Sequence, residues 1–150
     1  MRLLSISLAG IALLFSSASA QANECELTIS GNDAMQFDKK ELSVPASCEE
    51  VTLKLEHSGK LAAKVMGHNW VLSKASDKNA ITGAAVAAGM DNHYVPDSDQ
   101  VIAATDVIGG GESTSITFSV ADLDADEDYV FFCSFPGHWN IMTGSFNIKA

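Results

Sequence analysis

Apolar and polar residues alternate along several short stretches of the chain, the pattern typical of half-buried β-strands. In the stretch 24–30, the residues Cys25, Leu27 and Ile29 would share one face of a strand. Similar alternation, or a short apolar run, predicts further strands at 51–56, 70–72, 116–120, 129–133 and 144–149. Clusters of glycine, proline and asparagine separate these stretches, and we interpret Gly31-Asn32 and Val44-Pro45 as turns.

Many short, regularly spaced strands predict an all-β domain built as a β-sandwich. One segment does not fit the strand pattern. Residues 76–90 are rich in alanine and end beside Gly89, which predicts a helix there. The following stretch to residue 100 contains Pro96 with several Asp and Asn residues and is expected to be a loop. The chain has no internal repeat and no sign of a second domain.

The first twenty residues have the organisation of a secretory signal peptide. Arg2 gives a positive start, residues 3–15 are almost wholly apolar, and Ala18-Ser19-Ala20 matches the small-residue cleavage pattern. The apolar run is too short to span a bilayer, which takes about 20 such residues. We therefore expect residues 1–20 to be removed, leaving one domain at 21–150 in the periplasm. No cysteine follows the cleavage point directly, so no membrane anchor is expected.

Charge narrows the range of partners. The chain has 9 basic and 19 acidic residues, and removing the signal takes away only Arg2, which leaves 8 and 19, a net charge near −11. A protein this acidic is not expected to bind nucleic acid, whose phosphates repel it. The charge favours solubility and protein partners with basic faces.

The chain has three cysteines, an odd number for an exported protein. Cys25 and Cys48 lie near the start of the mature chain, whereas Cys133 lies near its end. The simplest pairing in an oxidising compartment is a Cys25–Cys48 disulfide, which leaves Cys133 as a thiol. A free thiol there needs protection, either by burial or by a metal.

Residues 133–142 follow a predicted strand directly and contain three soft or borderline metal donors. Cys133, His138 and Met142 stand at +5 and +4 spacing, and His68, before another strand, offers a second imidazole. Two imidazoles, a thiolate and a weak axial thioether form the electron-transfer site of copper proteins. Zinc would also accept Cys and His but would not need the methionine. Each residue alone is more often scaffold than ligand, whereas the combination predicts a copper site.

At this point the sequence resembles the azurin family of type 1 blue-copper proteins, the cupredoxins. The similarity rests on residues 66–70 (MGHNW) together with Cys133, His138 and Met142, and it extends over essentially all of 21–150. The resemblance implies an eight-stranded Greek-key β-sandwich with a short helical flap and one copper ion at one end. It also implies the roles of six residues: His68, Cys133 and His138 as equatorial ligands, Met142 as a weak axial ligand, the Gly67 carbonyl opposite it, and Asn69 as a tie between the ligand loops.

Three other residues near the predicted site have open roles. His57 resembles a buried, non-ligating histidine that titrates in this family, and a satisfied core histidine is an equal alternative. Trp70 is expected in the core. Trp139 departs from the family pattern, and we expect it to enlarge an apolar docking patch beside His138. The alternative is that Trp139 folds back and only shields the metal.

The predicted function is periplasmic electron transport. The protein would not be an enzyme and would pass single electrons between redox partner proteins, for which the resemblance suggests a c-type cytochrome or a copper-containing reductase. A periplasmic copper-binding carrier or chaperone is the main alternative, although such proteins favour exposed Met- and His-rich clusters. A multicopper enzyme would need more than the four histidines present, and a metal-free adhesion domain would leave the 133–142 motif without a purpose.

Overall fold

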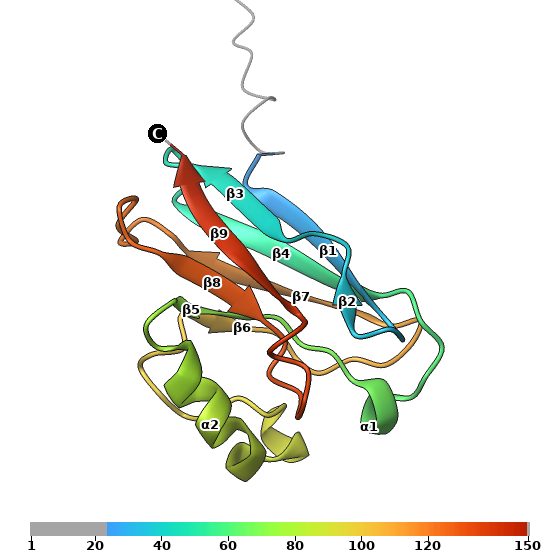
Figure 1. The fold of residues 1–150 in the computed structure, drawn as a ribbon. Helices are drawn as coiled ribbons and strands as arrows, with labels where there is room; N and C mark the ends of the chain where they lie inside the picture. Colours follow the sequence, from blue (N-terminus) through green and yellow to red (C-terminus); the bar gives the residue numbers. More distant parts are fainter. Residues whose placement is uncertain (1–23, 150) are drawn as a thin grey trace, which may run out of the picture.

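Two β-sheets pack face to face and enclose the core (Figure 1). The computed structural model describes residues 24–149, so the predicted signal peptide at 1–20 lies outside the described residues. The first sheet has the strand order β2-β1-β4-β7 and the second β3-β9-β8-β5-β6. The strands are β1 (Glu26–Asn32), β2 (Gln36–Phe37), β3 (Glu41–Pro45), β4 (Glu50–His57), β5 (Val71–Lys74), β6 (Ala103–Ala104), β7 (Ser113–Ser119), β8 (Tyr129–Phe132) and β9 (Thr143–Lys149).

The alternating positions of the sequence point into the space between the sheets, as predicted. In β4, Val51, Leu53 and Leu55 are fully buried and alternate with more exposed residues. β4 is central in its sheet, pairing in parallel with β1 and antiparallel with β7. The core between the sheets contains Trp70, which is fully buried against three phenylalanine rings, as expected of a core residue. The predicted β-sandwich is confirmed, although residues 24–149 form nine strands, two of them only two residues long, and not the eight that the resemblance implies.

Two predicted turns are wrong. Gly31-Asn32 ends β1, and the turn follows at residues 33–35. Val44-Pro45 ends β3, in which Leu42 and Val44 are buried on one face. Pro45 is tolerated because β3 is an edge strand that pairs only with β9, so a missing N–H interrupts no inner ladder.

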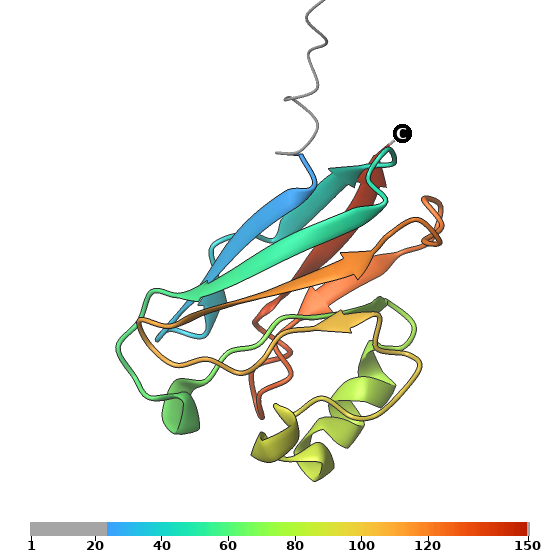
Figure 2. The same ribbon diagram turned by 180° about the vertical axis from the view of Figure 1, so that it is seen from behind.

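The helices gather at one end of the sandwich, opposite the end that holds the C-terminus (Figures 1 and 2). The predicted helix is α2 (Lys78–Ala88), which ends at Gly89, where φ is +75°. It packs on the second sheet because Ile81 joins Val71 and Phe132 in a second, smaller core. A 3₁₀ turn, η1 (Met90–Asn92), follows, and a one-turn helix that the sequence did not predict, α1 (Ala63–Met66), precedes β5.

The cysteines are arranged as predicted. Cys25 and Cys48 form a disulfide, with their Cα atoms 5.8 Å apart. Cys133 is a free thiol and fully buried. Within residues 24–149, no helix has the length and apolar character that crossing a bilayer requires.

Candidate metal centre

Three potential ligands meet at the end of the sandwich that carries the helices. His68 lies between α1 and β5, Cys133 directly follows β8, and His138 lies in the loop between β8 and β9. The Cys133 Sγ atom is 3.9 Å from Nδ1 of His68 and 3.7 Å from Nδ1 of His138. Among the described residues this is the one cluster of His, Cys, Asp or Glu side chains close enough to hold an ion, and all three members are buried. The structure therefore brings together the three predicted equatorial ligands.

Two backbone elements fix the position of His68. Its own N–H and C=O pair with Ile108 in an antiparallel bridge, with N···O distances of 3.0 and 2.9 Å. Its side chain donates a hydrogen bond from Nε2 to the Asn32 carbonyl, at 2.8 Å. Because Nε2 carries the proton in this bond, Nδ1 is left as the free electron-pair donor facing Cys133.

The loop from Cys133 to Met142 is closed by its own backbone. The Cys133 N–H donates to the Met142 carbonyl at 3.0 Å, and the Met142 N–H donates to the His138 carbonyl at 2.8 Å. Gly137 makes the turn before His138 with φ at +86°, a value that glycine adopts without strain. These contacts hold the three donor residues of the loop at fixed spacing.

Met142 and Gly67 lie next to the cluster of His68, Cys133 and His138. Met142 is fully buried, and its methyl group lies beside Gly31, where a Cβ atom would be 3.4 Å from Met142 Cε and 2.7 Å from His68 Cδ2. The Gly67 carbonyl oxygen is 4.0 Å from Cys133 Sγ. Gly31 and Asn32 are thus parts of the site that the sequence analysis missed. The sequence contains one weak signal for them, a glycine at position 31, where a side chain would collide with the His68 ring.

Asn69 ties the two ligand loops together, as the resemblance implies. Its side-chain oxygen accepts the Ser134 N–H at 2.8 Å, and its amide donates to the Ser134 hydroxyl and to the His93 carbonyl, each at 2.8 Å. Asn69 and Ser134 are both fully buried. A buried amide with these partners fixes the relative position of His68 and Cys133, which are their direct neighbours.

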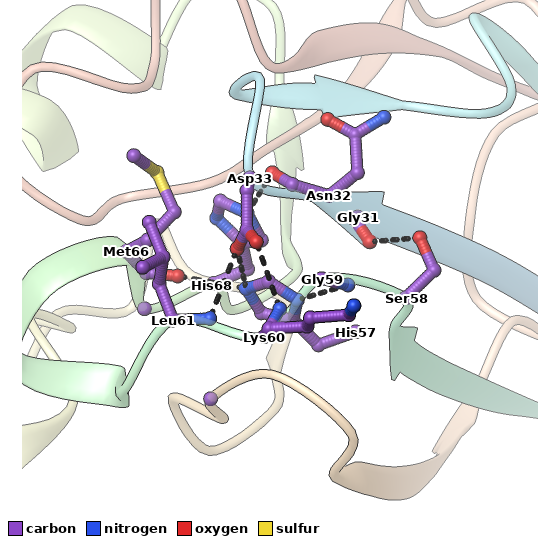
Figure 3. Close-up of polar contacts among 12 residues, drawn as sticks. Gly31, Asn32, Asp33, His57, Ser58, Gly59, Lys60, Leu61, Met66 and His68 are labelled. Carbon is purple, nitrogen blue, oxygen red and sulfur yellow. Dashed lines mark hydrogen bonds and ion pairs between the residues drawn. The ribbon is translucent and has the colours of Figure 1, made fainter.

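His57 and Asp33 lie close to His68 (Figure 3). The His57 ring stacks on the His68 ring, with 4.4 Å between centroids. Its Nδ1 accepts the Gly59 N–H at 3.0 Å and its Nε2 donates to the Met66 carbonyl at 2.8 Å, so the neutral imidazole satisfies both bonds. Asp33 accepts the Lys60 N–H, and this hydrogen bond is the main reason why the pKa of Asp33 is lowered. Both ring nitrogens of His57 are thus hydrogen-bonded, as the scaffold alternative expects.

The electrostatics of the metal-free cluster favour neutral groups. Burial raises the pKa of the Cys133 thiol to about 12 and lowers the pKa of His68 to about 4; burial also lowers the pKa of His138. Neutral imidazoles are ready to bind a metal, whereas a thiolate in this buried position needs a bound cation to stabilise it. The separations between the donor atoms suit an ion with bonds of about 2.0–2.3 Å. The residues present therefore fit a copper ion.

Trp139 lies differently from the docking role that we expected. Its side chain is only partly exposed and packs against the second core, formed by Val71, Ile81 and Phe132. The indole thus packs the loop that holds His138 against this second core. This placement supports the alternative in which Trp139 folds back and shields the site.

Comparison with known proteins agrees with this geometry. Residues 23–149 match the family described as copper binding proteins, plastocyanin/azurin family. The chain is 57% identical over 122 residues to azurin-1 of Alcaligenes xylosoxydans xylosoxydans, covering 81% of this chain and 95% of that protein. It is 51% identical over 143 residues to the azurin of Bordetella pertussis, covering 94% and 95%. A solved azurin structure from Methylomonas sp. strain J superposes with a TM-score of 0.81 at 44% identity, covering 84% of this chain and 98% of that one.

Proposed function

Because the chain belongs to the plastocyanin/azurin family of copper-binding proteins, we propose that it transfers single electrons through a type 1 copper site held by His68, Cys133 and His138. The observation that carries this proposal is the buried group of one thiol and two imidazoles, with 3.7 and 3.9 Å between Sγ and the two Nδ1 atoms. Copper bound there supplies a Cu(II)/Cu(I) couple.

The residues of the chain would act by holding one ligand geometry and by excluding water. Asn32 fixes the tautomer of His68, and Asn69 links the two ligand loops. All three equatorial side chains are nearly or completely buried. A ligand set that cannot rearrange, in a dry surrounding, suits electron transfer because little reorganisation accompanies the change of oxidation state. The proposal assigns no nucleophile or general base, and we infer an electron carrier rather than an enzyme.

We propose that Met142 and the Gly67 carbonyl would complete the ligand set as weak donors. The complete burial of Met142 beside His68 and the 4.0 Å between Gly67 O and Cys133 Sγ support these roles. Both groups are weak donors to copper, so they would tune the reduction potential more than they would hold the ion.

The Met142→Leu variant is therefore expected to keep its visible colour and to have a reduction potential raised by tens of millivolts. Leucine has nearly the volume of methionine, removes the thioether donor, and leaves a drier site that favours the less charged Cu(I). Cyclic voltammetry and an absorption spectrum measure both effects. The Met90→Leu variant makes the same exchange in η1 and should behave as wild type. An unchanged potential in Met142→Leu would remove Met142 from the ligand set.

A copper-binding carrier or chaperone is the alternative function. Such a protein exchanges its metal, whereas the buried cluster here has a single thiol enclosed by two loops. The copper-loaded wild-type protein should show an intense visible thiolate-to-copper band that bleaches on reduction and returns fully on reoxidation. A colourless protein that binds Cu(I) and releases it rapidly to a chelator would support the chaperone instead.

We propose that the protein acts in the periplasm on redox partner proteins, after removal of residues 1–20 as a signal peptide. The signal-like sequence and the disulfide between Cys25 and Cys48 support an oxidising compartment. A c-type cytochrome or a copper-containing reductase is the proposed class of partner. Mixing the reduced protein with purified candidates of both classes and following the return of colour would identify the acceptor.

A further inference from the structure

Two consecutive residues directly after η1, His93 and Tyr94, adopt the left-handed backbone conformation, with φ of 53° and 57°. Residues other than glycine seldom adopt it, although His does so more readily than Tyr. Such a conformation persists where the surrounding structure holds it, and it often occurs beside a functional site. The contacts of these two residues lead toward the metal centre.

His93 contacts two segments that flank His68. Its Nδ1 accepts the Val107 N–H at 3.0 Å, and its Nε2 lies 3.2 Å from Oδ1 of Asp106. Its carbonyl accepts the hydrogen bond from Asn69 at 2.8 Å. Val107 directly precedes the residue that bridges to His68, and Asn69 directly follows His68. His93 therefore contacts both the segment that pairs with His68 and the residue that follows His68.

Tyr94 contacts the loop of the other imidazole ligand. Its ring meets the Phe135 ring edge to face, with 5.1 Å between centroids. The Phe135 ring in turn lies 4.7 Å from the ring of His138. Aromatic pairs at such distances attract one another beyond the area that they bury. Tyr94 therefore limits the positions open to Phe135.

The contacts of His93 and Tyr94 converge on Gly67. A Cβ atom at Gly67 would be 2.5 Å from Val107 Cγ1 and 3.0 Å from Phe135 Cε2. Val107 and Phe135 thus pack directly against this glycine, and one is held by His93 and the other by Tyr94. Displacement of either would open space in which Gly67 and the adjacent His68 could move.

We propose that residues 93–94 form a clamp that positions Gly67 and His68 for copper. His93 and Tyr94 would act through their contacts with Val107, Asn69 and Phe135, which makes them positioning residues. The proposal rests on the ligand assignment made above, and it adds the turn after η1 to the frame of the metal site.

Variants of His93 separate the hydrogen bond from the backbone conformation. His93→Gly adopts the left-handed conformation freely but lacks the acceptor for the Val107 N–H. His93→Asn also tolerates this conformation and places a side-chain oxygen close to the position of Nδ1. The asparagine variant is therefore the matched control. It keeps an acceptor for the Val107 N–H, which the glycine variant lacks, and both variants tolerate the left-handed conformation.

In His93→Gly, the Val107 amide of the metal-free protein should exchange with solvent roughly five- to tenfold faster than in wild type. The copper-loaded variant should release its metal to a chelator faster by a similar factor, with a shifted visible spectrum. His93→Asn should restore both rates and the spectrum. Tyr94→Leu, which removes the aromatic edge, should also speed copper release, whereas Tyr94→Phe should behave as wild type because its ring is kept.

The clamp would be contradicted if His93→Gly lost stability but kept the wild-type copper release rate and spectrum, since its role would then be purely structural. Should the glycine variant not fold, ¹⁵N NMR of the wild-type imidazole decides, because an Nδ1 that carries a proton cannot accept the Val107 N–H. A wild-type protein that takes up no copper would contradict the proposed function instead. The exchange rate of the Val107 amide in wild type and His93→Gly would still test the hydrogen bond between Val107 and His93.

Discussion

The Cys133→Ser variant, loaded with Cu(II), is expected to have lost the intense visible band of the wild-type protein. The band arises from charge transfer between a cysteine thiolate and copper, and a serine hydroxyl does not provide it. Cys133 is the one free cysteine in the described chain, and both imidazoles face its sulfur. Absorption and electron paramagnetic resonance spectra of the loaded variant measure the change.

The matched control makes the same replacement at the other two cysteines. The double variant Cys25→Ser/Cys48→Ser keeps Cys133 and should therefore stay coloured. Residual intense colour in Cys133→Ser would show that copper takes its sulfur from elsewhere. Loss of colour in the double variant would show that the disulfide, and not Cys133 alone, is needed for the site.

The same double variant is expected to lose about 3 kcal/mol of its free energy of unfolding. The Cys25–Cys48 bridge closes a loop with a sequence separation of 23, so breaking it gives the unfolded chain more conformational freedom. Urea unfolding of the metal-free protein, at equal protein concentration, gives the difference. Wild-type protein whose disulfide has been reduced chemically should show the same loss. A free energy equal to that of wild type would mean that the bridge adds no stability.

The fold was predictable where a strand has an alternating face. The strands β1, β4, β5, β7, β8 and β9 were found because each has a run of alternating or continuous apolar residues. β3 was missed because Pro45 was interpreted as part of a turn, although an edge strand accepts proline at its end. β2 and β6 have two residues each and α1 has four, which is too short for any periodicity to appear.

The metal site was predictable in its side chains and not in its backbone. Cys133, His138 and Met142 lie within ten residues, and the spacing of their donors is visible in the sequence. Asn32 acts through its backbone carbonyl, which every residue has, so the residue type at position 32 does not reveal this role. The contacts of His93 with Val107 depend on a left-handed turn after the flap, which the sequence suggests only as a polar loop.

The position of β9 has a consequence for how the chain folds. β9 lies between β3 and β8, so β3 joins the second sheet only when residues 143–149 have paired with both strands. Its pairing with β3 joins segments separated by most of the chain, and such non-local contacts slow folding. Met142 directly precedes β9. The pairing of β9 would therefore complete the second sheet and fix the end of the ligand loop together.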